Sequence, residues 1–153
     1  MKLRRERREH PHHFFSREEK MSIAAAIAAA EGKTSGEIKI HVESECGGKP
    51  VARAQQVFAA LGMERTAARN GVLIYLAVKE RRFAIIGDSG IDRAVPAGFW
   101  EETKDEMALH FKKGQFVEGV VHGIASAGEH LARYFPRQAD DVNELPDEVS
   151  EGK

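Results

Sequence analysis

The fold is decided by Arg69-Asn-Gly-Val-Leu-Ile-Tyr-Leu-Ala-Val-Lys-Glu-Arg-Arg-Phe-Ala-Ile-Ile-Gly-Asp-Ser-Gly-Ile91. Its two apolar runs, residues 72–78 and 83–86, are separated by a charged turn, which is typical of a β-hairpin. The first run is apolar without alternation, so we expect a central strand that is buried on both faces. The hairpin returns Asp88 to the edge of the sheet where Asn70 begins the first strand. We expect any chemistry of this protein at that edge.

The flanking sequence supplies one further strand and several helices. Residues 37–43 alternate between isoleucine or valine and polar side chains, which predicts a strand with one buried and one wetter face. Ser16 and Glu19 form a capping-box pattern at the start of the first helix. Helical periodicity and stop signals predict helices over residues 17–31, 51–61, 96–113 and 116–135.

This order of elements predicts the α/β class. A strand–helix–strand step followed by an antiparallel hairpin gives a mixed sheet with helices on both faces. The first two strands should run parallel and the third should run back. The starts of the first two strands and the end of the third then share one edge, where we expect a polar pocket.

Composition indicates one domain with charged ends. The chain has 153 residues, with 23 basic and 24 acidic side chains, and this balance disfavours a nucleic-acid or membrane-surface partner. We expect a basic disordered arm over residues 1–13, a folded domain over 14–135 and an acidic disordered tail over 136–153.

Other signals favour a cytoplasmic monomer without a membrane span. Cys46 is the single cysteine, so no internal disulfide can form. No apolar run reaches the roughly 18–20 residues that cross a bilayer. The alanine-rich residues 21–30 resemble part of a signal peptide, but the charged residues 17–20 directly before them favour an ordinary amphipathic helix.

The same segments resemble the TPM domain family, named for thylakoid-lumen, photosystem-associated and membrane-bound relatives. The resemblance spans residues 14–135. The family includes soluble bacterial members, and this chain resembles that branch. It rests on Thr34-Ser-Gly-Glu-Ile38, Asn70-Gly-Val-Leu73, Arg82-Phe-Ala-Ile-Ile-Gly-Asp-Ser-Gly-Ile91, Phe99-Trp100 and Phe111-Lys-Lys-Gly-Gln-Phe116. It implies a three-layer α/β/α sandwich, somewhat Rossmann-like, with a divalent-cation site in loops at one sheet edge. It also implies weak acid-phosphatase activity, which has been credited to some members.

The residues themselves offer a cation site at the same edge. Ca²⁺ and Mg²⁺ prefer oxygen ligands, and we predict that Asp88, Asp92, Asn70 and Glu37 supply them. A capped turn is the alternative, with Asp88 bonding its own backbone and Asp92 serving the next helix. Many relatives have an acidic residue where this chain has Arg69, so the resemblance implies a weaker or rebuilt site here.

Three functions therefore remain open. The first is a divalent-cation-binding interaction or regulatory module, with an unidentified protein partner and without established catalysis. The second is a metal-assisted phosphoester hydrolase, in which Asp88 ligates the cation or acts as nucleophile. The third is a structural adaptor. We expect His41 to be a surface or capped histidine, and Cys46 to be an unreactive loop thiol because no histidine lies nearby in sequence.

Overall fold

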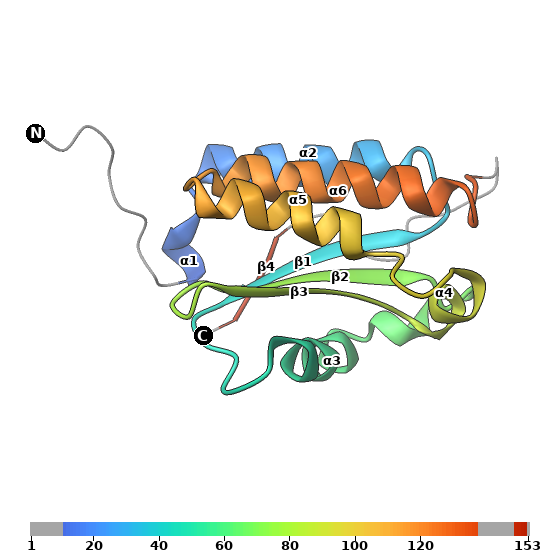
Figure 1. Cartoon of the computed structure of the whole chain (residues 1–153), viewed down its shortest axis with the longest axis horizontal. Helices are drawn as coiled ribbons and strands as arrows, with labels where there is room; N and C mark the ends of the chain where they lie inside the picture. The colour runs from blue at the N-terminus through green and yellow to red at the C-terminus, as the bar shows by residue number, and fades with distance from the viewer. Residues whose placement is uncertain (1–10, 138–148, 153) are drawn as a thin grey trace, which may run out of the picture.

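The computed structural model describes residues 11–137 and 149–152, and within them the protein is a three-layer α/β/α sandwich. One face of the sheet is covered by α2 (Arg17–Glu31), α5 (Glu101–Lys112) and α6 (Phe116–Ala132), and the other by α3 (Pro50–Ala60), as Figure 1 shows. This architecture confirms the expected fold class.

The sheet is mixed and has the strand order β3-β2-β1-β4. β1 (Glu37–Glu43) runs parallel to β2 (Gly71–Ala77), and β3 (Arg82–Gly87) returns antiparallel to β2. These three strands confirm the predicted strand directions. β4 (Ser150–Glu151) adds a short parallel strand at the free side of β1, pairing Ser150 with His41.

Each face of the sheet supports its own apolar core. Every residue of β2 is buried, as expected from its unbroken apolar run. Val72, Ile74 and Leu76 join the larger core under α2 and α6. Leu73 and Tyr75 join the smaller core under α3.

Local signals set the helix ends and their packing distance. Ser16 and Glu19 form the predicted capping box at the start of α2. Small residues bring α6 close to its neighbours, as expected from its glycines. A Cβ at Gly123 would lie 2.9 Å from Met107 Cγ, and one at Gly128 would lie 2.8 Å from Ala30 Cβ.

Three expectations differ from the structure. The predicted helix over residues 96–113 is wrong at its start, because α4 (Ser89–Ala94) ends before Pro96 and α5 begins at Glu101. The segment between them contains Gly98 with a positive φ of 77°. The predicted wetter face of β1 is also wrong, because α3 and the C-terminal segment lie nearby and all seven residues are buried.

The third difference concerns the chain ends. Pro11–Phe14 form α1 where the sequence suggested part of a disordered arm. Ser150–Glu151 form β4 where it suggested a disordered tail. The rest of the two arms, residues 1–10, 138–148 and 153, lies outside the described residues. Among the helices that the structure describes, none combines the length and apolarity needed to cross a membrane.

Candidate functional site

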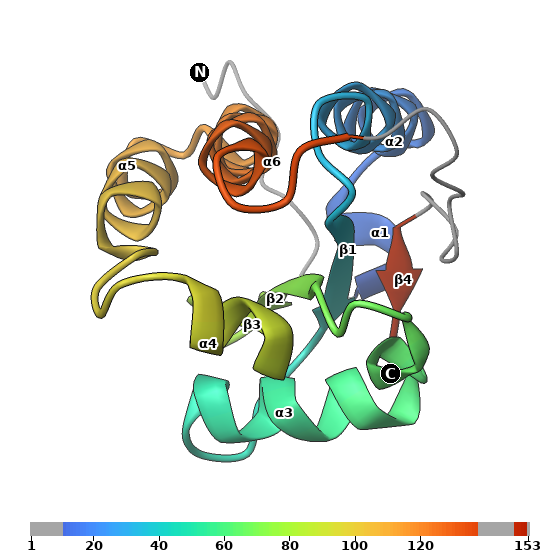
Figure 2. The same cartoon turned by 90° about the vertical axis from the view of Figure 1, so that its right-hand side faces the viewer.

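The predicted edge of the sheet does bring the expected segments together. Figure 2 looks onto it, with α4 and the loop before β2 toward the viewer. The register pairs Glu37 with Gly71, and Val72 with Gly87. The backbone N–H of Asp88 donates to Gly71 O at 2.9 Å. The acidic glycine corner therefore lies beside the first residues of both parallel strands.

Asp88 is held at this edge by several hydrogen bonds. Its carboxylate is buried and accepts two hydrogen bonds from Arg69, Nε to Oδ2 at 2.8 Å and Nη2 to Oδ1 at 2.9 Å. Oδ1 also accepts from the backbone N–H of Ser89 at 2.7 Å, which caps α4. The capped-turn interpretation is therefore correct for Asp88. Its hydrogen bonds to Asp88 raise the pKa of Arg69 above its usual value, so the guanidinium stays charged.

The other predicted ligands differ in their surroundings. Glu37 is buried at the start of β1, and its backbone N–H donates to Asn70 O at 3.3 Å. Asn70 is also buried, and its Nδ2 donates to Ser35 Oγ at 3.4 Å. Asp92 is exposed on α4. The structure thus brings Glu37, Asn70 and Asp88 to one edge and leaves the Asp92 side chain in solvent.

Carboxylates alone do not make a cation site here. Within residues 11–137 and 149–152, no group of three or more His, Cys, Asp or Glu side chains is placed to hold a metal ion. Two oxygens in the loop before β2, Glu64 Oε2 and Thr66 Oγ1, are buried without a hydrogen-bond partner among the described residues. Glu64 also interacts electrostatically with Arg69. A cation at this edge would need these oxygens, or amide and backbone oxygens, in addition to Asp88.

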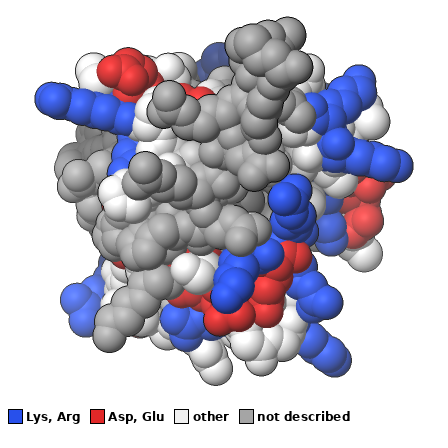
Figure 3. Space-filling view, turned by 90° about the vertical axis from the view of Figure 1, so that its left-hand side faces the viewer, with Lys and Arg blue, Asp and Glu red and all other residues white. Residues whose placement is uncertain are grey.

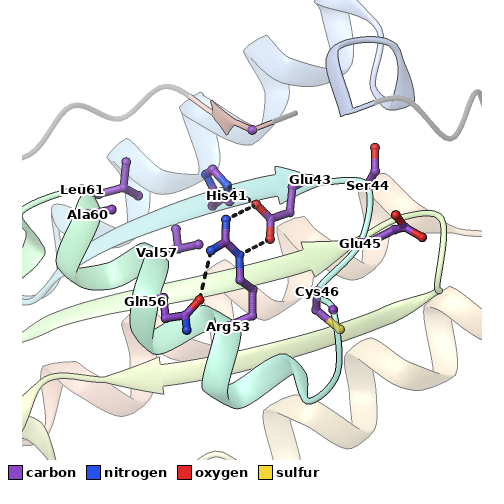
Figure 4. A pocket seen from close by; sticks show the side chains of 12 residues that line it. His41, Glu43, Ser44, Glu45, Cys46, Arg53, Gln56, Val57, Ala60 and Leu61 are labelled. Atoms are coloured by element: carbon purple, nitrogen blue, oxygen red, sulfur yellow. Dashed lines mark hydrogen bonds and ion pairs between the residues drawn. The ribbon is translucent and has the colours of Figure 1, made fainter.

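A pocket with both polar and apolar lining lies at the opposite end of β1, where sequence reasoning did not place one. It has a volume of about 650 Å³ and lies between the end of β1 and α3. Figure 4 shows His41 and Glu43 on β1 facing Arg53 and Gln56 on α3. Gly152, from the C-terminal segment, also lines it.

Glu43 is the centre of this pocket. Arg53 donates to it twice, Nε to Oε2 at 2.7 Å and Nη2 to Oε1 at 3.0 Å. The hydroxyl of Tyr75 also donates to Oε2. Burial opposes ionisation of Glu43, but the hydrogen bonds from Arg53 and Tyr75 outweigh it and lower the pKa of the carboxyl. The pocket therefore contains a charged carboxylate whose oxygens are already paired within the protein.

The pocket histidine and cysteine are both restrained. His41 is buried, with Nε2 3.3 Å from Glu43 Oε1, and burial lowers its pKa. Of the two predicted alternatives, a surface or a capped histidine, the structure fits the second, because both ring nitrogens have hydrogen-bond partners within the protein. Cys46 Sγ donates to Glu80 Oε1 at 2.9 Å, and burial together with this acceptor raises the pKa of the thiol. The structure supports the expectation of an unreactive thiol.

One sequence signal could have found this pocket. In sheets with parallel strands, ligands bind outside the carboxyl ends of the strands, and Glu43 is the last residue of β1. The alternation in β1 places His41 and Glu43 on one face. The pairing of Glu43 with Tyr75, however, joins residues 32 positions apart and needs the tertiary structure.

Comparisons with known proteins agree with the fold. The sequence model of the TPM domain matches residues 10–130. The chain is similar to the BA42 protein of the psychrophilic bacterium Bizionia argentinensis, whose NMR structure shares 45% identity with a TM-score of 0.86. That alignment covers 91% of this chain and 96% of BA42. No curated protein matches the sequence.

Two more distant solution structures share the fold alone. The N-terminal domain of a protein from P. gingivalis has 19% identity and a TM-score of 0.63, covering 81% of this chain and 82% of that one. The N-terminal domain of the cg2496 protein from Corynebacterium glutamicum has 16% identity and a TM-score of 0.61, covering 91% and 80%.

Proposed function

This chain belongs to the TPM domain family, and from that premise we propose that it binds a divalent cation, Ca²⁺ or Mg²⁺, as an interaction or regulatory module. The proposed site is the sheet edge where β1 and β2 begin and β3 ends. Asp88 would be the central ligand. Asn70, Glu37 and Asp92 are the further ligands expected from the sequence, and Glu64 and Thr66 are added from the structure.

The observation that carries the proposal is the environment of Asp88. Its carboxylate is buried, fixed by the start of α4, and lies beside a loop with buried oxygens that have no hydrogen-bond partner among the described residues. Hard cations accept such mixtures of carboxylate, hydroxyl, amide and backbone oxygens. The exposed Asp92 is the weakest member of this set, since it could reach a cation only through water or a change of rotamer.

Arg69 changes how the site must work. Its guanidinium occupies both oxygens of Asp88 and must leave before a cation can bind there. The side chain is 46% exposed, so it can move into solvent without disturbing the core. Arg69 therefore competes with the ion for the carboxylate of Asp88, and the affinity of the site for the cation should be modest.

A titration of backbone amide shifts with Ca²⁺ and with Mg²⁺ tests the proposal. The variant Asp88→Asn keeps a good N-cap but removes the charge, and Asp105→Asn, an exposed acid on α5, is the matched control. We expect shifts around residues 87–92 in the wild type and in Asp105→Asn, and none in Asp88→Asn. A cation concentration of about 10 mM is well above the dissociation constants of extracellular calcium modules, so unchanged spectra at that concentration would reject the site.

Phosphoester hydrolysis is the second candidate, favoured by the position of Arg69. Once released from Asp88, an exposed guanidinium beside a cation could bind the oxygens of a phosphoryl group. The cation would supply Lewis-acid polarisation of that group. Hydrolysis of several phosphoesters should then fall with chelator, with Asp88→Asn and with Arg69→Ala. Activity that is insensitive to all three would belong to a contaminant.

A further inference from the structure

The C-terminal residues Ser150, Glu151 and Gly152 lie along the free side of β1 as an added strand. The pairing is parallel and joins His41 to Ser150 and Val42 to Glu151. The backbone N–H of Gly152 donates to Val42 O at 2.8 Å. β1 has seven residues, and two of them pair with this segment. A short strand that occupies part of a sheet edge has the geometry of peptide recognition by strand addition.

Ser150 and Glu151 each contact a different side chain of the domain. Ser150 Oγ lies 2.9 Å from His41 Nδ1, on the face of β1 that carries the pocket. Glu151 Oε2 lies 2.6 Å from Lys20 Nζ, which extends from α2 on the other layer. A strand bound at this edge therefore meets His41, which binds a hydroxyl, at one position and the positively charged Lys20 at the next.

The third position favours glycine because a side chain there would meet its neighbours at unusually short distances. A Cβ on Gly152 would lie 3.0 Å from both His41 Nε2 and Glu43 Oε1, and 3.1 Å from Glu43 Cβ. Glu43 cannot easily move away, because Arg53 and Tyr75 hold both of its oxygens. The buried network of the pocket thus acts as a steric filter at this position.

We propose that this edge of β1 is a binding site for an extended segment of a partner protein with the sequence Ser-acidic-Gly. In the isolated chain its own C-terminal residues fill the site and compete with the partner. Backbone hydrogen bonds to β1 supply general affinity, and His41, Lys20 and the steric filter supply sequence preference. The site lies at the opposite end of β1 from the proposed cation site and does not depend on it.

Charged side chains of both signs lie on the described part of the end where β1 and β2 finish. Figure 3 looks onto the end where β1 and β2 finish, and acidic and basic side chains lie next to one another over its lower half. Among the described residues in this view, neither sign dominates in a way that would steer an oppositely charged partner. The proposed sequence preference therefore rests on the short-range contacts of Ser150, Glu151 and Gly152.

The test uses the full chain carrying Gly152→Val as the protein to which a peptide is added. A valine side chain would crowd His41 and Glu43, so we expect the cis segment to leave and the amide signals of His41 and Val42 to shift. A synthetic peptide of sequence Val-Ser-Glu-Gly-Lys, corresponding to residues 149–153, is then titrated. We expect it to restore the wild-type shifts at millimolar concentration and to have little effect on wild type. The control peptide carries the same Gly152→Val change and should bind at least about tenfold more weakly, a difference of roughly 1.4 kcal/mol.

A second variant, Glu151→Lys, places a lysine opposite Lys20 and releases the segment by charge repulsion instead of steric conflict. It should bind the same peptide. Unchanged His41 and Val42 signals in both variants, no response to peptide, or equal binding of both peptides would each overturn the proposal. A cation titration of the same samples reports on residues 87–92 separately, so failure of one site is distinguishable from failure of the other.

Discussion

Arg69 binds Asp88 through two parallel hydrogen bonds, 2.8 Å and 2.9 Å long, at the edge where the sequence places a cation ligand. Such a bidentate pair fixes both oxygens of the carboxylate. Arg69 itself has a positive φ of 52°, a backbone conformation that residues other than glycine seldom adopt. Both oxygens of Asp88, the central ligand of the proposed cation site, are thus bound by Arg69 in this structure.

Replacing Arg69 should strengthen cation binding. In Arg69→Ala the ion no longer competes with a guanidinium for Asp88, and we expect an affinity roughly two- to fivefold higher, the scale of a partly exposed ion pair. Isothermal titration with Ca²⁺ measures it, with Arg65→Ala as a control at an exposed arginine of the same loop. An affinity that falls or stays constant would show that Arg69 does not compete.

Gly90 should be intolerant of a side chain. A Cβ there would lie 2.6 Å from the backbone oxygen of Arg69 and still closer to that of Ala68, and backbone atoms cannot rotate away. We expect Gly90→Ala to lower the free energy of unfolding by about 2–3 kcal/mol. Urea denaturation followed by circular dichroism measures this, with Ser89→Ala as the neighbouring control. A loss below about 0.5 kcal/mol, typical of surface changes, would contradict the close approach.

Glu43 should make stability depend on pH in the acid range. Its pKa is lowered in the folded protein, so the carboxylate adds stability above the usual value of 4.5 and loses it as the pH falls through the folded-state pKa. Glu43→Gln should be less stable by about 1–2 kcal/mol at neutral pH and should lose less on acidification. Urea unfolding at several pH values measures both effects, and parallel curves for the two proteins would contradict the assignment.

His41 should titrate below its ordinary value. Burial lowers its pKa from 6.5, although Glu43 opposes the shift while Arg53 and Lys39 add to it. The folded protein therefore binds this proton less readily than the unfolded chain, and stability falls as the pH drops below about 6.5. NMR titration of the imidazole protons measures the pKa. In Gly152→Val it should rise toward 6.5, because the C-terminal segment no longer covers the ring. An equal His41 pKa in wild type and in Gly152→Val would show that the C-terminal segment does not cause the burial of His41.

Cys46 should react slowly with alkylating reagents. Its raised pKa keeps the thiol protonated, and the thiolate is the reactive form. Glu80→Gln removes a negative charge beside Sγ, so we expect severalfold faster reaction with iodoacetamide at pH about 8, near the usual thiol pKa. Glu45→Gln, an exposed acid in the same loop, is the control. Equal rates in Glu80→Gln and wild type would mean that burial alone protects the thiol.

The polar residues show where prediction from sequence stops. The approach of Asp88 to the start of β2 followed from the hairpin, because the antiparallel return is set by the turn and the two apolar runs. The partner of Asp88 did not follow, since a charged arginine could equally have pointed into solvent. The face of β1 that was expected to be wet became buried because α3 and residues 150–152 lie nearby, and no pattern within residues 37–43 indicates either.

Sequence patterns alone predict the three-strand core, its strand directions, the capped first helix and the family. These depend on local signals: unbroken or alternating apolar runs, a charged turn and a capping box, all within a few residues of each other. Which polar groups contact one another depends on how the layers of the fold pack. The contacts of Asp88 with Arg69, Glu43 with Tyr75 and His41 with Ser150 span 19, 32 and 109 residues, and such pairings arise from packing between layers. For this reason the fold could be predicted from the sequence, whereas the side-chain contacts at both ends of β1 could not.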